Sequence, residues 1–503
     1  MLVGKSTAEY VLVKGIIYAF SYLGLICLIY FYLALSIGGV RWISHPFSIA
    51  VEVLGAIEIL FYLFWFLPYR YYLHKQRPWF PPPPTPEARK EIFYKSLSVT
   101  DDIELCLKKW MGGSSLEDLR RENLKEWLLW ALFDRDGPPG ADDAELEGYV
   151  EAVEEALGRE IQPGLGPVES VRLNFQPFII THRALTFYLI IGCIDFTASI
   201  TLLVAGFSFY RQPRLKFFKS FPLRPLTLIA SNQSASPRMS YFYRPHTSKK
   251  NRPIVFIHCV GIGLALYIPF FLMLPKDIGI LAIEFLPVSS RICEGAPLAE
   301  DIAREIGDII TQQNLTDFVF VGNSYGTFFT KLFLSSSHLA SRMAKIVLID
   351  PVAILLHFPD AATNFTRRKP RFANELELYW AAQTEPDIAF TFAKRMCWRE
   401  HVLWREDLLK KPTTVIMGGS DCLVKPEAIA AGAKAGALKW DWEDREKWKR
   451  SLNDWTGEGL ELVWLEGYDH GQGILGQKML PRIVRIVERY CEKKVVHGNA
   501  VMK

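Results

Sequence analysis

The feature that most constrains the fold is the segment 317–326, Asp-Phe-Val-Phe-Val-Gly-Asn-Ser-Tyr-Gly. Its first half is an apolar, aromatic-rich run typical of a buried strand, and its last five residues match G-x-S-x-G. Residues 327–334 are rich in apolar side chains and predict a helix. A strand, a tight turn and a helix are the local structure that this motif requires. The sequence therefore predicts a buried strand that presents Ser324 at its end.

The residue types of this turn have steric and chemical reasons. Side chains at Gly322 and Gly326 would clash with the neighbouring strand and helix, and the residue at the apex takes a strained backbone conformation. Such a turn exposes the Ser324 hydroxyl and leaves the Tyr325 N–H free to face a developing negative charge. The motif is short and recurs by chance, so its interpretation depends on partners elsewhere in the chain.

Two later strands supply such partners. Apolar runs at 413–417 and 460–465 predict buried strands, and the loops that follow them carry Asp421 and His470. In open parallel sheets, sites are built where strands end at their carboxyl edge. A serine hydroxyl needs a histidine to take its proton, and that histidine needs a carboxylate to orient it. We therefore predict Ser324 as nucleophile, His470 as base and Asp421 as the orienting acid.

Other residues compete for these roles. Asp350 also follows a predicted strand and is an alternative acid. Asp469 is interpreted as a turn residue, because Asp often caps turns. His357 and His401 are interpreted as structural or surface residues, and Cys422 as a buried cysteine and not a second nucleophile.

The order of elements predicts the fold class. Predicted strands and helices alternate through the C-terminal half, and the strands are continuous apolar runs of the kind buried on both faces. The predicted elements are strands at 239–243, 253–258, 278–285, 317–321 and 344–350, and helices at 264–274 and 299–313. This predicts an α/β domain at 225–495 with a mainly parallel, doubly wound sheet.

By these motifs, the segment 225–491 resembles α/β-hydrolase fold serine hydrolases, whose triad follows the chain order Ser, Asp, His. The resemblance implies an acyl-enzyme mechanism with no metal and no organic cofactor. His258 and Cys259 lie where the family carries its His-Gly oxyanion loop. The resemblance thus implies oxyanion donors at the backbone of Tyr325 and of Cys259 or Val260. Cys259 departs from the family's glycine, and His258 is expected to hold the loop by hydrogen bonds.

The resemblance also implies a helical cap at about 352–411, an insertion that is rich in Phe, Tyr and Trp. An aromatic cap on a membrane-tethered hydrolase indicates an apolar acyl ester as substrate. The same aromatic residues are also compatible with the cap's own core.

The N-terminal region 1–80 predicts a membrane hairpin. Residues 15–37 carry no charge and are long enough to span a bilayer, and they are too long for the apolar core of a signal peptide. A second apolar segment, 47–67, carries Glu52 and Glu58 and precedes a basic, tyrosine-rich flank. We expect Glu52 near the interface and Glu58 neutral or packed against the first helix. The basic flank places both ends of the hairpin in the cytosol, and we assume the endoplasmic reticulum membrane.

The third apolar segment, within 178–224, has two interpretations. Residues 178–210 could span the membrane with Asp195 turned to a partner, or lie against the catalytic domain as an interfacial cover of the active site. The basic residues that follow favour the second, because a further crossing would place them outside. The catalytic domain is then cytosolic.

Between the hairpin and the third segment lies the region 81–177. Pro81 to Pro84 predict a stiff spacer, and the rest is helical, with an apolar stripe that starts after a capping box from Ser114 to Glu117. We expect these helices to pack on the catalytic domain and not to build a separate site. The hairpin with this helical region resembles membrane-anchored fungal members of the hydrolase superfamily.

Composition narrows the function. A net charge of +4, without a stripe of Lys and Arg among aromatics, gives no argument for nucleic-acid binding. The eight cysteines show neither C-x-x-C nor metal-ligand spacing. The sequence predicts a membrane-anchored, lipase-like serine esterase whose partners are a lipid bilayer and an apolar acyl ester. An acyltransferase with the same triad and a catalytically silent scaffold remain as alternatives, and protein partners stay open.

Overall fold

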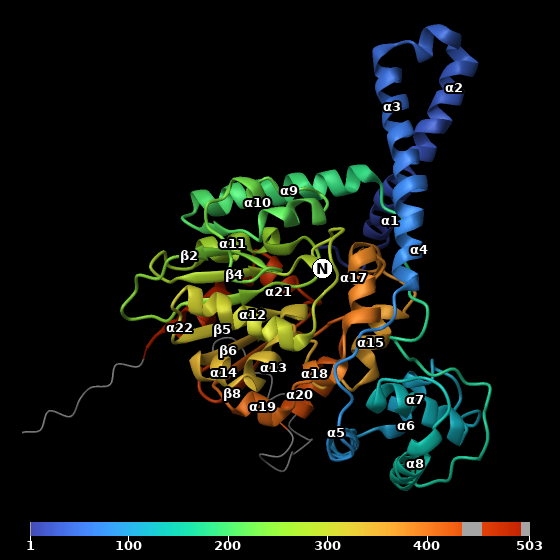
Figure 1. Ribbon diagram of the computed structural model, residues 1–503, viewed down its shortest axis with the longest axis vertical. Helices are drawn as coiled ribbons and strands as arrows, with labels where there is room; N and C mark the ends of the chain where they lie inside the picture. The colour runs from blue at the N-terminus through green and yellow to red at the C-terminus, as the bar shows by residue number, and fades with distance from the viewer. Residues whose placement is uncertain (1, 435–454, 494–503) are drawn as a thin grey trace, which may run out of the picture.

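The computed structural model describes residues 2–434 and 455–493, and a mixed sheet of eight strands forms the centre of this part (Figure 1). Met1, in the predicted membrane region, and residues 494–495, at the end of the predicted catalytic domain, lie outside the described residues. The strands are β1 (Ser208–Tyr210), β2 (Ser240–Arg244), β3 (Ile254–Ile257), β4 (Ile280–Glu284), β5 (Phe318–Asn323), β6 (Met343–Ile349), β7 (Thr413–Gly418) and β8 (Leu460–Leu465).

The strand order identifies the fold. It runs β1-β2-β4-β3-β5-β6-β7-β8, with β1 and β2 antiparallel to their neighbours and the pairs from β4 to β8 parallel. This is the sheet of the α/β-hydrolase fold, so the predicted fold class is confirmed. The structure adds β1, which the sequence interpretation had placed inside the third apolar segment.

Helices cover both faces of the sheet. Val255 and Ile257 of β3 pack in one layer with α12 (Ala299–Gln312) and α13 (Phe328–Ser335). Ile254 and Phe256 pack in the other with α11 (Ile268–Met273) and α22 (Leu480–Cys491). Because both faces are buried, the strands read as continuous apolar runs. Shorter helices complete these layers: α10 (Leu226–Ile229), α14 (Ser337–Arg342), α20 (Pro426–Lys434) and α21 (Gln472–Leu475).

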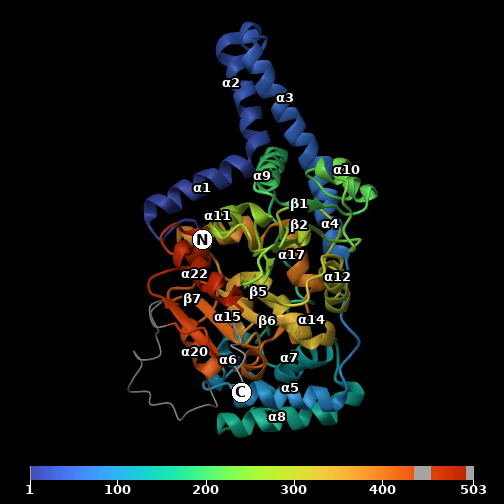
Figure 2. The same ribbon diagram turned by 90° about the vertical axis from the view of Figure 1, so that its left-hand side faces the viewer.

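A helical hairpin projects from one end of this body (Figures 1 and 2). Its helices are α2 (Leu23–Ile43) and α3 (Pro46–Phe61), and α3 continues through a π-helical turn, η1 (Tyr62–Phe66), into α4 (Leu67–Lys75). The predicted single helix at 15–37 is wrong in its bounds. The helix is interrupted at Tyr22, and the residues before it form a separate helix, α1 (Thr7–Ser21). Among the described residues, three helices are long and apolar enough to cross a membrane: Leu23–Ile43, Pro46–Lys75 and Leu185–Val204.

The third of these helices, α9 (Leu185–Val204), lies across the body below the hairpin, in side view in Figure 1 and end-on in Figure 2. Its carboxylate at Asp195 forms ion pairs with Arg224 (3.2 Å), at the end of the same segment, and with Arg291 (2.9 Å) of the catalytic domain. The partner that this carboxylate requires is therefore the catalytic domain itself.

Glu58 joins the hairpin to α9. It is buried and packs near Gly24 of α2, as expected. Its carboxylate also accepts hydrogen bonds from the N–H groups of Leu185 (2.7 Å) and Thr186 (2.8 Å) and from the Thr186 hydroxyl (2.5 Å). These are N–H groups of the first turn of α9, which have no partner within the helix. An acid of one apolar segment thus caps the helix of another, a role that the sequence did not indicate.

The helical region occupies the opposite end of the body from the hairpin (Figures 1 and 2). It consists of α5 (Pro86–Ser98), α6 (Ile103–Trp110), α7 (Arg121–Phe133) and α8 (Asp143–Leu157), which share their own apolar core. The capping box predicted at Ser114 is wrong: α7 begins at Arg121, and the Asn123 side chain accepts from the Arg120 N–H.

Residues 352–411 form a helical layer beside the carboxyl edge of the sheet. Its α-helices are α15 (Pro359–Thr366), α16 (Ala373–Leu378), α17 (Pro386–Phe390), α18 (Trp398–His401) and α19 (Arg405–Leu409), with π-helical turns η7 (Tyr379–Gln383) and η8 (Thr391–Arg395). Several of its aromatic residues belong to the main core, including Phe365 and Trp404.

The ion pairs of Arg224 yield a stability prediction. Its buried guanidinium also contacts Glu284 (2.6 Å) and the Ser240 hydroxyl (3.0 Å). Replacing it, Arg224→Met, leaves Glu284 without its cation and Asp195 with Arg291 alone, and should lower the free energy of unfolding by about 3–5 kcal/mol. Denaturant titration of the detergent-solubilised protein measures this change.

Lys216→Met is the matched control. Lys216 pairs with Glu294, whose side chain is half exposed, so its loss should change the free energy of unfolding by about 0–1 kcal/mol. Equal effects of the two substitutions would contradict the assignment of Arg224 as the anchor of α9.

Candidate active site

The turn after β5 holds Ser324 in a strained conformation. Its φ is +49°, in the left-handed region that non-glycine residues rarely adopt. The flanking glycines have no room for a side chain: a Cβ at Gly326 would lie 2.2 Å from the Ile257 carbonyl oxygen, and one at Gly322 would lie 2.8 Å from the Gly326 carbonyl oxygen. The turn therefore packs closely against strand β3, and this contact fixes the direction of the serine side chain.

Ser324, His470 and Asp421 form one hydrogen-bonded chain. The Ser324 Oγ lies 2.7 Å from His470 Nε2, and His470 Nδ1 lies 2.7 Å from Asp421 Oδ2. With the imidazole proton on Nδ1, donated to the carboxylate, Nε2 is left to accept the serine proton. The structure thus brings together the three residues that the sequence selected, from the loops after β5, β7 and β8.

The competing acids have other partners. Asp350 accepts hydrogen bonds from the N–H groups of Gly418 (2.9 Å) and Gly471 (2.8 Å) and bonds neither ring nitrogen of His470. Burial raises its pKa to about 6. Asp350 therefore connects β7 with the loop after β8 that carries His470.

Asp469 has a similar structural role. It accepts from the N–H groups of Cys422 (2.8 Å) and His470 (2.7 Å) and from the Asn374 side chain of cap helix α16. The interpretation as a turn residue holds, and the link to the cap is new. Burial raises the pKa of the Cys422 thiol well above its usual range, so this cysteine is not a thiolate nucleophile at neutral pH.

The pKa values of His470 and His258 shift in opposite directions. Burial by itself lowers the pKa of His470, but the charge and hydrogen bond of Asp421 outweigh it, and the net pKa lies above its ordinary value. Burial lowers the pKa of His258 to about 4, so this ring is neutral. His258 accepts from the Phe285 N–H (3.0 Å) and donates to the Cys259 carbonyl (2.7 Å), which fixes its loop.

The expected oxyanion donor at Cys259 is corrected by the structure. Its N–H donates to the Tyr267 hydroxyl (3.1 Å), which in turn donates to Asn323 Oδ1 (2.5 Å). Within the described part of the chain, the Val260 N–H has no acceptor. The Tyr325 N–H lies in the first turn of the short 3-10 helix η6 (Ser324–Thr327), where N–H groups have no partner within the helix. The two free donors beside Ser324 are thus Val260 and Tyr325.

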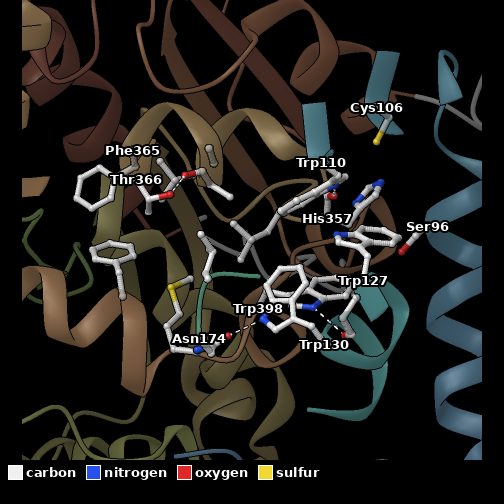
Figure 3. A pocket seen from close by; sticks show the side chains of 18 of the residues that line it. Ser96, Cys106, Trp110, Trp127, Trp130, Asn174, His357, Phe365, Thr366 and Trp398 are labelled. Atoms are coloured by element: carbon white, nitrogen blue, oxygen red, sulfur yellow. Dashed lines mark hydrogen bonds between the residues drawn. The ribbon is translucent and has the colours of Figure 1, made fainter. Parts of the chain in front are cut away.

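An apolar pocket opens at Ser324. Its empty volume is about 1420 Å³, including space open to solvent, and Val260, Ser324 and Tyr325 form one part of its wall. The other part comes from α5, α6 and α7 together with the cap, through residues such as Leu107, Trp110, Trp127, Leu132, Phe365 and Trp398 (Figure 3). We expected no separate site in the helical region, and its tryptophans line the same pocket as the serine, a contribution that the sequence did not indicate.

The sequence signal for this wall was the tryptophan content of 110–130, which also suits an ordinary helical core. His357 lies in the pocket wall, whereas His401 contacts the Phe328 carbonyl (3.4 Å) behind it. Among the described residues, no group of three or more His, Cys, Asp or Glu side chains is arranged to hold a metal ion.

Comparisons with known proteins give only distant likenesses. No known protein family and no curated protein matches the chain. Solved structures similar to it include a bacterial membrane phospholipase A, described as a virulence factor, with 12% identity, a TM-score of 0.37 and coverage of 60% of this chain and 92% of that one. A naproxen esterase from Bacillus subtilis has 13% identity, a TM-score of 0.36 and coverage of 51% and 89%. A thermophilic esterase from Thermogutta terrifontis has 14% identity, a TM-score of 0.35 and coverage of 51% of this chain and 95% of that one.

These likenesses are too weak to assign a substrate or a reaction. The fold rests on the strand order and the strained turn of this chain.

The contact of Asp421 with His470 predicts a pKa change. Asp421→Asn removes the charge that raises the pKa of His470 and leaves the burial that lowers it, so the pKa should fall below the wild-type value. An NMR titration of isotope-labelled histidine measures it, and the resonances of His258, far along the chain in another loop, serve as internal control. An unchanged His470 pKa would contradict the assigned contact.

Proposed function

We propose that the protein is a membrane-bound serine hydrolase that cleaves carboxylic esters of apolar acyl groups. The observation that carries this proposal is the hydrogen-bonded chain Ser324–His470–Asp421, whose serine lies in the wall of an apolar pocket. A serine becomes a nucleophile when an adjacent base accepts its proton, and the two 2.7 Å contacts have the geometry for that transfer.

The reaction follows from the atoms in place. Ser324 Oγ attacks the ester carbonyl while His470 Nε2 takes its proton, and Asp421 stabilises the imidazolium. The negative charge that develops on the carbonyl oxygen meets the free N–H groups of Val260 and Tyr325. The C–O bond to the alcohol then breaks, and His470 returns the proton to the leaving oxygen. Water, deprotonated by His470, then attacks the acyl carbon, the bond from this carbon to Ser324 Oγ breaks, and His470 returns the proton to Oγ as the carboxylic acid is released.

The pocket indicates an apolar acyl group. Its wall is mostly Leu, Phe, Trp, Val and Ala side chains contributed by the helical region and the cap. Each methylene buried there gains about 0.8 kcal/mol of transfer free energy, so chain length should strongly affect binding.

The lipid bilayer is the proposed environment. The hairpin of α2 and α3 would insert with its connecting turn on the far side, while α9 would lie flat in the interface because its middle is held by Arg224 and Arg291. Basic residues flank the hairpin on the side of the body, which favours a cytosolic catalytic domain and a membrane such as that of the endoplasmic reticulum.

A fluorophosphonate probe tests the nucleophile. Wild-type protein in detergent should be labelled at Ser324, and Ser324→Ala and His470→Ala should each abolish labelling with unchanged circular dichroism. Ser341→Ala, at an exposed position of α14, is the matched serine control and should label like wild type. Wild-type protein that stays unlabelled in both detergent and bilayers would overturn the proposal. Product analysis with an added alcohol then shows whether water or the alcohol receives the acyl group.

The membrane arrangement has its own test. Asn232 and Asn314 are exposed and lie in Asn-x-Ser/Thr sequences. With the catalytic domain in the cytosol they should carry no glycan after expression in eukaryotic cells, as measured by gel mobility before and after peptide-N-glycosidase. An acceptor site within a long extension inserted between Ser44 and His45 should be glycosylated in the same cells. Glycans on the native sites would contradict the arrangement.

A further inference from the structure

Two polar side chains in the wall of the apolar pocket have no hydrogen-bond partner. Among the described residues, neither Nδ1 nor Nε2 of His357 contacts an acceptor or donor, and the same holds for Nε1 of Trp127. His357 is 8% exposed, and all three nitrogen atoms are shielded from the solvent. Burying such groups without a partner costs free energy, so their arrangement needs an explanation.

Several other polar side chains of this wall are satisfied within the chain. The hydroxyls of Ser96, Thr100 and Thr366 each donate to the carbonyl of a residue one helical turn earlier. The Asn174 amide accepts from Trp130 Nε1 (2.9 Å) and donates to the Ala393 and Met396 carbonyls. Unpaired nitrogen is therefore not a general property of this pocket but is concentrated at Trp127 and His357.

Trp110 places these two side chains on one part of the wall. Its ring centroid lies 5.6 Å from that of Trp127, and its own N–H donates to the His357 carbonyl (3.2 Å). Figure 3 shows the His357 imidazole beside the indoles of Trp110 and Trp127. The imidazole is also held between Phe358 and Trp404, with ring centroids 4.5 and 5.1 Å away, so it cannot turn toward solvent without repacking.

The chemistry of the nitrogens selects the ligand group. Trp127 Nε1 only donates, and a neutral imidazole donates from one nitrogen and accepts at the other. Burial lowers the pKa of His357 to about 3, so the ring is neutral at physiological pH. An oxygen atom can pair with these groups: a carbonyl oxygen accepts from an N–H group, and a hydroxyl accepts from an N–H group and donates to the accepting nitrogen of the imidazole. A plain hydrocarbon chain satisfies neither.

We propose that Trp127 and His357 form an acyl-side subsite that binds a hydroxyl or carbonyl oxygen carried on the acyl group of the substrate. The subsite rests on the proposed function, because it places the acyl part of an ester in the pocket that begins at Ser324. It lies between the helical region and the loop after β6, so it makes the helical region a determinant of specificity and not only a support.

Matched ester pairs test the subsite. We would measure kcat/KM for 4-nitrophenyl esters of a saturated long-chain acid and of the same acid with one hydroxyl or one keto group, moved stepwise along the chain. Wild-type protein should prefer the oxygenated ester at one position by tenfold or more, because that oxygen pairs groups that are otherwise buried unpaired. His357→Phe and Trp127→Phe should reduce this ratio to near one.

Controls separate folding and catalysis from selectivity. Fluorophosphonate labelling of Ser324 in each variant reports an intact triad, and His357→Asn, which restores a donor and an acceptor, should recover part of the ratio. His338→Phe, a matched exchange on the exposed side of α14, should leave the ratio at the wild-type value.

The outcomes are distinct. Equal kcat/KM for plain and oxygenated esters at every position, or a wild-type ratio in both His357→Phe and Trp127→Phe, would overturn the subsite and indicate that these nitrogens bind water only. Absence of Ser324-dependent labelling and of cleavage in both ester series would instead overturn the proposed function itself.

Discussion

The close approach of Gly326 to the Ile257 carbonyl is the constraint on which the site depends. A Cβ at this glycine would lie 2.2 Å from that oxygen, so the turn after β5 can pass β3 only without a side chain. The close packing against β3 keeps Ser324 at a φ of +49°, a strained conformation that an isolated turn would not maintain. The serine hydroxyl and the Tyr325 N–H are thereby fixed relative to the sheet, and the loops after β7 and β8 bring Asp421 and His470 to them.

Buried carboxylates hold the distant segments of this chain together. Asp350 joins β7 to the histidine loop, and Asp469 joins that loop to the cap. On the membrane side, Asp195 fastens α9 to the catalytic domain, and Glu58 fastens the hairpin to α9. Each of these acids is stabilised by N–H groups or by guanidinium groups, which replace the water that a carboxyl group loses on burial. Their partners lie far away in the sequence, so the same interactions that satisfy the charges also define the relative positions of the segments.

The pocket is a product of three regions that the sequence keeps apart. The sheet contributes Ser324 and the free N–H groups, the insertion after β6 contributes the cap, and the helical region contributes the tryptophan wall. The hairpin and α9 lie at one end of the body and the helical region at the other (Figures 1 and 2). If the protein has the proposed function and membrane arrangement, an acyl group bound at Ser324 would lie away from the bilayer, and contacts with side chains would decide which acyl group fits.

The sequence by itself determined the local structure around the strongest patterns. Buried strands with apolar runs, the glycines around Ser324, the chain order of Ser324, Asp421 and His470, and the apolar hairpin are local signals, because each rests on neighbouring residues or on spacing. The confirmed fold class followed from their alternation.

Tertiary structure decided what depends on contacts across the chain. The N–H of Cys259 cannot donate to an oxyanion, because it already donates to the Tyr267 hydroxyl. The partners of Asp195 and Glu58 lie far from them in the sequence. The apolar stripe of the helical region gave no sign that Trp110 and Trp127 face the serine pocket, since a stripe shows which face of a helix is buried and not what buries it. Hydrogen-bond and packing partners are set by the three-dimensional approach of distant residues, which no local pattern encodes.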